Sequence, residues 1–229
     1  MKIRLISFSL LTIFTSAISN AQSARLVGGV NLANVSVTDN GRVDDANMLT
    51  SFRLGIIGDL PIAGIVSFQP GILYTGKGSK VQNGNEGDVG YFKQTFNPTY
   101  IEVPMNFVFK TPAVKSTRFF AGAGPYLAIG VAGKVKTQRN FGVGATETER
   151  SIKFSNDDPT TFNEEEGTGF GVLKRFDYGL NGTAGIEGKS LVLSVDYGLG
   201  LAKLQSGSNS SEDNNNKHRV LGITLGFKL

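Results

Sequence analysis

The chain contains no cysteine, and this absence excludes three kinds of chemistry. The protein cannot form disulfide bonds, build a thiolate metal site or use a cysteine nucleophile. If it is exported, its fold must therefore be held by its own hydrogen bonds and packing.

Long apolar runs are also missing after the first twenty-one residues. No later segment approaches the roughly 20 consecutive apolar residues that a membrane helix needs, and none keeps an apolar period of 3.6 residues. A helix bundle is therefore not expected. A membrane-embedded chain of this kind must hydrogen-bond its backbone between strands of a closed sheet, and 30 glycines with 40% hydrophobic residues suit close-packed strands.

The charge is nearly balanced, with a formal net charge of +4, and lysine and arginine form no cluster along the chain. Nucleic-acid binding needs a basic patch or stripe, so we expect no nucleic-acid partner.

The start of the chain has the three parts of a secretory signal peptide. Lys2 and Arg4 give a positive region, residues 5–18 form an apolar stretch, and residues 19–21 form a small-residue cleavage site. We expect residues 1–21 to be a signal peptide and residues 22–229 to be the mature domain. An uncleaved anchor is the alternative, but the apolar run is short and interrupted by serine and threonine.

Eight later segments alternate apolar and polar side chains, and their connections are in turn long and short. Bacterial outer-membrane barrels have an even number of antiparallel strands, with short periplasmic turns and longer outer loops. The predicted fold is therefore all-β, an eight-stranded antiparallel up-and-down transmembrane β-barrel with both ends in the periplasm. The expected strands cover residues 24–37, 51–59, 65–75, 97–110, 118–131, 173–187, 191–202 and 217–229.

Each clear strand has one apolar face and one polar face. In residues 191–202, for example, Leu193 and Val195 share one face while Ser194 and Asp196 share the other. We expect the apolar face to touch lipid and the polar face to line the lumen. Glycines on the polar faces, aromatic residues near the strand ends and an apolar final strand favour this arrangement over a soluble lipocalin-like ligand-binding barrel, in which the faces are reversed.

Pro70, Pro104 and Pro125 lie inside expected strands, where each removes a donor from the hydrogen-bond ladder. We expect a local bulge, a lumenal water or a side chain at each site.

Three motifs contain these prolines, and a fourth motif follows them: FQPGILYTGKG (68–78), YIEVPMNFVFK (100–110), FFAGAGPYLAIG (119–130) and FDYGLNGTAGIEG (176–188). In order and spacing, the chain resembles the PorT-like outer-membrane β-barrel family. The resemblance implies an eight-stranded barrel in the outer membrane of a diderm bacterium and implies no reaction. The best-known member is tied to a secretion and gliding apparatus.

Eight strands enclose a lumen that side chains just fill. Arg53, Glu102, Arg175 and Asp177 are expected to face it in its outer half. Charges in a narrow lumen must find partners, so we predict an ion-paired plug. Separately solvated charges in a wet vestibule are the alternative, and a distance above about 6 Å from Arg53 to every carboxylate would exclude the plug. The charged residues expected at the periplasmic rim are Arg25, Asp59, Lys110, Arg118, Glu187 and Lys228.

No catalytic, cofactor or metal site is predicted. The single histidine, His218, opens the last expected strand, and Asp196 lies about five residues deeper, roughly 17 Å away at strand rise. The acidic residues 157–158 and 164–166 in the longest connector lack the spacing and the turning glycine of a calcium loop. We therefore expect no enzyme activity and no cofactor.

The sequence thus predicts a non-enzymatic integral outer-membrane barrel with a structural or interaction role. We expect outer-membrane lipid to surround the barrel. Loops 76–96 and 132–172, or the periplasmic turns, are expected to contact an extracellular or envelope protein. A more specific version of this role is an accessory to a secretion or envelope system. A soluble ligand-binding barrel and a narrow passive channel are the alternatives.

Overall fold

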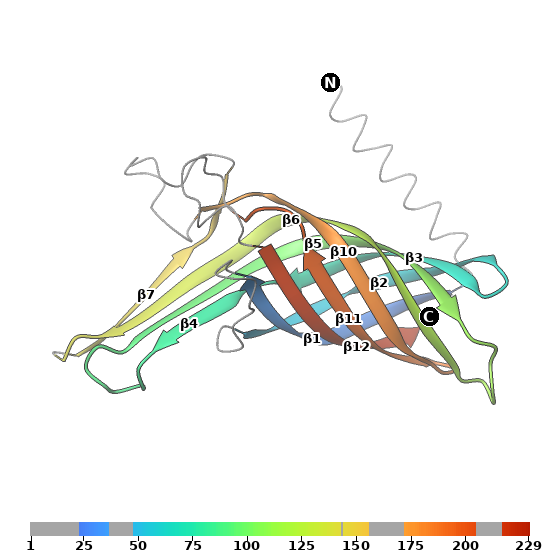
Figure 1. The fold of residues 1–229 in the computed structure, drawn as a ribbon, viewed down its shortest axis with the longest axis horizontal. Helices are drawn as coiled ribbons and strands as arrows, with labels where there is room; N and C mark the ends of the chain where they lie inside the picture. Colours follow the sequence, from blue (N-terminus) through green and yellow to red (C-terminus); the bar gives the residue numbers. More distant parts are fainter. Residues whose placement is uncertain (1–22, 37–47, 143, 156–171, 205–216) are drawn as a thin grey trace, which may run out of the picture.

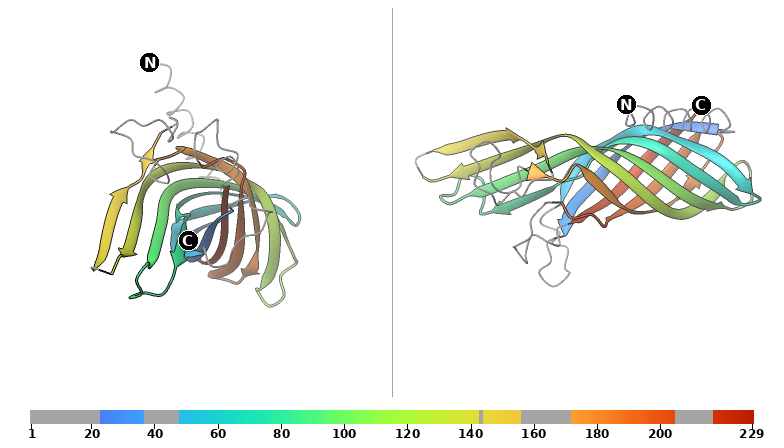
Figure 2. Two further views of the ribbon diagram at one scale, coloured as in Figure 1. Left: turned by 60° about the vertical axis from the view of Figure 1, so that its left-hand side comes forward. Right: turned by 90° about the horizontal axis from the view of Figure 1, so that it is seen from above.

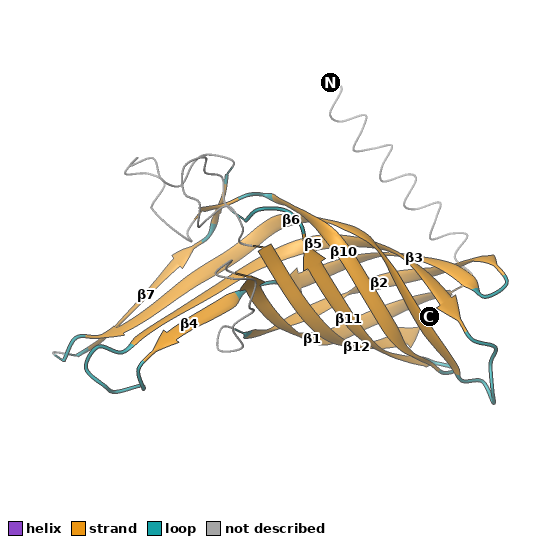
Figure 3. Cartoon of the chain, in the orientation of Figure 1, coloured by secondary structure: helices purple, strands orange, loops and turns teal. Residues whose placement is uncertain are grey.

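The computed structural model describes residues 23–36, 48–142, 144–155, 172–204 and 217–229. The expected signal peptide and the acidic residues between 157 and 166 lie outside these ranges. In the described part, no helix is long and apolar enough to cross a membrane, and strands dominate the picture (Figure 3).

Eight antiparallel strands form a closed ring in the order β1, β2, β3, β5, β6, β10, β11, β12 (Figure 1). The ring closes between β1 and β12, where twelve residue pairs run from Arg25–Lys228 to Ser36–Lys217. The strands of the ring are β1 (Ser23–Ser36), β2 (Leu49–Ala63), β3 (Val66–Gly76), β5 (Phe92–Lys110), β6 (Arg118–Asn140), β10 (Phe176–Glu187), β11 (Leu191–Gly200) and β12 (Lys217–Lys228). The predicted eight-stranded barrel is confirmed.

Two connectors that we expected to be loops instead contain strands. β4 (Ser79–Asn83) pairs with the start of β5, and β7 (Ala145–Ser151) pairs with the end of β6. The short strands β8 (Lys153–Phe154) and β9 (Val172–Leu173) form a parallel pair. Apolar alternation does not reveal β4 and β7, because polar residues occur on both of their faces.

The result is a four-stranded sheet, β4-β5-β6-β7, that continues beyond one end of the ring; we call it the extracellular sheet. Figure 2 shows it running past the barrel along the tilt of the strands. The short turns between β2 and β3, β5 and β6, and β10 and β11 lie at the opposite end. Short turns mark the periplasmic side of such barrels, so the sheet lies on the outer side.

Apolar side chains cover the outside of the ring, as predicted. Leu54, Leu127 and Ile223 are 60%, 58% and 56% exposed, which a soluble barrel cannot tolerate on its surface. The soluble lipocalin-like alternative is therefore wrong. The aromatic residues expected at the two membrane interfaces are all exposed on this face: Phe52, Tyr74, Phe107, Phe109, Phe119, Phe176, Tyr178 and Phe227.

The three mid-strand prolines cause no bulge. The pairing register is the same on both sides of Pro70, Pro104 and Pro125, although partners are skipped beside each of them. The register shifts fall elsewhere, between Pro61 and Ala63 and beside the Thr99–Tyr100 step. Of the three alternatives expected at each proline, the bulge is therefore excluded, because the ladder keeps its register there.

The lipid-facing surface can be tested on one strand. Val195 lies at the middle of β11 and Leu191 at its periplasmic end, and both are about half exposed. Val195→Arg should lower the free energy of unfolding in lipid vesicles by about 2–4 kcal/mol, because it places a charge at the bilayer midplane, whereas Leu191→Arg should lower it by about 0–1 kcal/mol. Denaturant titrations in vesicles measure both. Equal costs would show that this face does not cross the membrane.

Candidate functional site

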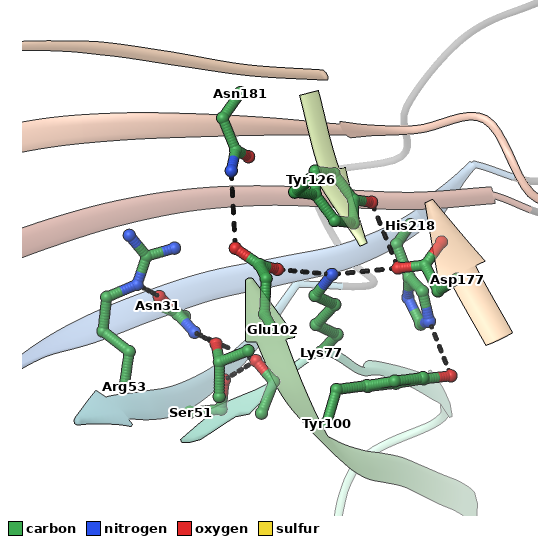
Figure 4. Close-up of polar contacts among 12 residues, drawn as sticks. Asn31, Ser51, Arg53, Lys77, Tyr100, Glu102, Tyr126, Asp177, Asn181 and His218 are labelled. Carbon is green, nitrogen blue, oxygen red and sulfur yellow. Dashed lines mark hydrogen bonds and ion pairs between the residues drawn. The ribbon is translucent and has the colours of Figure 1, made fainter. Parts of the chain in front are cut away.

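Lys77, which follows β3, is the centre of a buried charge cluster at the outer end of the lumen (Figure 4). Its Nζ atom lies 2.6 Å from Glu102 Oε2 and 2.9 Å from Asp177 Oδ2. It also lies 4.0 Å from the centre of the Tyr126 ring. All of these side chains are buried. One lysine therefore compensates two carboxylates that come from β5 and β10.

The register explains why these two carboxylates meet. Glu102 and Asp177 are both paired with Ala128 of the intervening strand β6. The small alanine side chain leaves space above β6 for the Lys77 ammonium group. The Tyr126 hydroxyl donates a hydrogen bond to Asp177 Oδ2 (3.1 Å), and Asn181 Nδ2 donates to Glu102 Oε1 (3.4 Å).

A second cluster lies deeper and is built around Arg53. Its Nη1 atom is 3.1 Å from Asp196 Oδ2, and its Nε atom donates to Asn31 Oδ1 at 2.7 Å. Thr224 donates to the same Asp196 oxygen at 2.8 Å. A Cβ atom at Gly222 would lie 2.8 Å from Arg53 Cζ, so a larger residue at this position would displace the guanidinium.

A third cluster fills the periplasmic end. Lys110 forms ion pairs with Asp59 and with Glu187, the latter at 2.9 Å, and Lys228 lies 2.5 Å from Glu187. Asp59, Lys110 and Glu187 are buried. The charges that we expected at the periplasmic rim are thus partly a paired network inside the barrel mouth, beside a cavity of about 400 Å³.

Apolar side chains close the lumen above the Lys77 cluster. They come from the ring, from the extracellular sheet and from β9, and we call this group the apolar cap: Val35, Phe96, Val135, Ile152, Leu173 and Leu204, with Phe154 packed against them. Phe154 packs edge-on against Tyr100 at 5.9 Å. Its ring occupies the space where a Cβ atom of Gly130 would lie, 2.1 Å from the nearest ring carbon.

The four predicted site residues are only partly brought together. Glu102 and Asp177 share Lys77, whereas Arg53 pairs with Asp196. Arg175 lies outside the lumen: it is exposed at a bend before β10, and its Nη2 atom donates to the Phe154 carbonyl at 3.4 Å. The prediction that Arg175 belongs to the lumenal cluster is therefore wrong. Arg175 lies at a bend, and the alternation of inward and outward side chains does not extend through a bend.

Lys77 is the central residue that the sequence analysis missed. It lies just past the end of β3, in a region assigned to a loop. Its position has the same parity as the inward-facing Leu73 and Thr75. Extending the alternation by two residues would have placed it in the lumen.

His218 is buried beside the Lys77 cluster, and among the described residues it is hydrogen-bonded to no serine or carboxylate. Its Nε2 atom lies 3.2 Å from the Tyr100 hydroxyl. Its Nδ1 atom has no hydrogen-bond partner among the residues described. The described part of the chain also contains no group of three residues that could hold a metal ion.

The tip of the extracellular sheet is a second candidate site. Its two turns are tied together, because the backbone N–H of Gly90 donates to the Asn140 carbonyl at 2.8 Å and Asn140 Nδ2 donates to the Gly87 carbonyl at 3.0 Å. Val89 and Phe141 nevertheless remain 77% and 66% exposed. An ordered turn pair thus presents apolar side chains to the outside.

A family model described as "Outer membrane protein beta-barrel domain" matches residues 20–206. The chain belongs to this family. It is therefore an outer-membrane β-barrel protein, located in the bacterial outer membrane. A search of curated proteins gave no match.

Solved structures with a similar arrangement include two outer-membrane proteins. Ail, the attachment invasion locus protein of Yersinia pestis, is 15% identical over 90% of this chain and 98% of its own, with a TM-score of 0.41. Neisserial surface protein A is 12% identical over 90% of this chain and 96% of its own, with a TM-score of 0.42.

The shared cation can be tested by removing it. Lys77→Met should lower the free energy of unfolding by about 3–5 kcal/mol, because it leaves two buried carboxylates without a counterion. The triple variant Lys77→Met, Glu102→Gln, Asp177→Asn removes the charges together and should recover most of that loss. Denaturant unfolding in detergent micelles measures the difference. A triple variant no more stable than the single variant would show that Lys77 does not act by compensating these carboxylates.

Proposed function

We propose that this protein is a closed, non-catalytic outer-membrane anchor that presents its extracellular sheet to a protein partner. The observation that carries the proposal is the pair of exposed apolar residues, Val89 and Phe141, on a tip whose turns are hydrogen-bonded to each other. Exposed apolar residues on an ordered surface are typical of protein contact sites.

The filled lumen supports an anchor rather than a channel. Each lumenal carboxylate named above is paired with a cation, and the apolar cap covers the outer end. Between the Arg53 and Lys77 clusters, the described residues leave a cavity of about 20 Å³, which holds about one water molecule. This small cavity and the paired charges support a closed interior.

An accessory role in a secretion or envelope system is the more specific form of this function. The PorT-like motifs at residues 68–78, 100–110, 119–130 and 176–188 support it. In that form, the partner is a component of the same envelope machinery.

The position of the partner can be mapped by photo-crosslinking in the native outer membrane. A benzophenone amino acid at Phe141 should crosslink to a protein, because this side chain lies at the exposed tip. The matched control is Val114, which is 72% exposed in the periplasmic turn between β5 and β6. Crosslinks from position 114 alone would place the partner in the periplasm. The absence of a crosslinked protein at position 141 would contradict the proposed contact.

Conductance measurements test the closed lumen. The purified protein should give no discrete current steps in planar bilayers, because paired charges and the apolar cap occupy the ion path. Regular single-channel openings would favour the narrow passive channel and would contradict the anchor.

A further inference from the structure

The outward face of the extracellular sheet continues the lipid-facing surface of the barrel but changes from apolar to basic. On β5 this face runs from Ile101 to Lys93. On β6 it runs from Ile129 to Lys134 and Lys136, because these lysines are paired with outward positions of β5. The same side of the wall therefore touches hydrocarbon at one level and carries lysines at the next.

Four lysines gather on this surface, which we call the lysine face: Lys80, Lys93, Lys134 and Lys136. Lys80 is paired with Thr95, and Thr95 with Lys136, so Lys80 and Lys136 share one row two strands apart. Their backbones are about 10 Å apart at normal strand spacing. Lys93 lies one row farther out, and Lys134 one row nearer the membrane.

Two of these lysines are neutralised by β7. Lys134 lies 2.5 Å from Glu149 and Lys136 lies 2.8 Å from Glu147. The hydrogen bond between Lys136 and Glu147 raises the pKa of the lysine and lowers the pKa of the glutamate, so both remain charged. Lys80 and Lys93 have no ion-pair partner among the residues that the structure describes. The lysine face therefore carries an excess of positive charge.

The lysine face begins at the outer edge of the lipid headgroup layer. Lys134 lies opposite Asn97, four residues beyond Ile101 on β5. At strand rise and a tilt of about 40°, this row lies about 10 Å above the last lipid-facing isoleucines, and the Lys93 row about 20 Å above them. The headgroup layer above these isoleucines is about 5–8 Å thick, so the long lysine side chains must extend back toward the membrane to reach a phosphate.

We propose that the lysine face binds the phosphate groups of lipids in the outer leaflet that surrounds the barrel. Basic residues near a membrane surface are attracted to anionic headgroups, and a lysine ammonium binds phosphate as a point charge. The continuity of this face with the lipid-facing wall favours a lipid over a soluble partner. The tip residue Phe141 takes no part, so this inference does not depend on the proposed function.

The test uses the full mature chain refolded in a zwitterionic detergent. Three probes separate the sources of phosphate: lipid A with two phosphates, the same lipid after dephosphorylation, and inorganic pyrophosphate. The double variant Lys80→Gln, Lys93→Gln breaks no ion pair of the described residues. It should weaken binding of the phosphorylated lipid about 30-fold, about fivefold for each lysine.

The control variant Arg139→Gln, Arg150→Gln makes the same change of charge on the opposite face of β6 and β7, where Arg139 packs over the Phe92 ring. It should leave the affinity for phosphorylated lipid A within about twofold of the wild-type value. Heat-modifiable mobility in detergent gels confirms that both variants are folded.

The phosphorylated lipid should bind more tightly than its dephosphorylated form, and pyrophosphate should bind weakly. Equal binding of the two lipids, or an equal loss in the two double variants, would overturn the proposal. Pyrophosphate binding as tight as that of the phosphorylated lipid would assign the face to a free phosphate instead. Crosslinking at position 141 tests the proposed function separately, and its outcome does not change with these variants.

Discussion

A lipid bilayer offers no hydrogen-bond partner to a backbone amide, so each peptide group in the hydrocarbon layer must be paired within the protein. The pairing of β1 with β12 meets this requirement, because it joins the first and last strands of the ring and leaves no open edge in the membrane. Once the ring is closed, the two faces of each strand meet different surroundings. Outward side chains touch lipid, and inward side chains share a narrow lumen.

The size and the polar content of the lumen follow from the closure of the ring. Eight strands leave just enough interior space for side chains, and polar groups without water must pair with one another. Lys77 forms ion pairs with Glu102 and Asp177, while Arg53 forms an ion pair with Asp196. The interior is thus an internally compensated set of charges under an apolar cap, which explains why its residues do not resemble a catalytic site.

Along their length, strands β5 and β6 pass from the membrane-spanning ring into the extracellular sheet, and their surroundings change. Within the membrane, β5 and β6 have one apolar and one polar face. Beyond it they gain β4 and β7 as neighbours, and their outward positions become lysines. The barrel is thus the base of an ordered sheet, for which we propose contacts with lipid headgroups on one face and with a protein at the tip.

Alternation predicted the strands of the ring well because the membrane imposes it residue by residue. The outward position of Val195 and the inward position of Asp196 follow from parity alone. Partners across the lumen could not be predicted, because they depend on the register between strands: Glu102 and Asp177 meet only through Ala128. Arg175 was placed wrongly because a bend ends the alternation before β10. β4 and β7 were missed because water on both sides of the extracellular sheet removes the apolar signal.

The central claim is that the apolar side of the wall touches lipid acyl chains. The chain has no tryptophan, so a single tryptophan can report on one position. Tyr197 faces outward at 46% exposure and Tyr126 faces the lumen at 2%. In vesicles of lipids with brominated acyl chains, the fluorescence of Tyr197→Trp should be strongly quenched and that of Tyr126→Trp far less. Strong quenching at position 126 with none at position 197 would contradict the account.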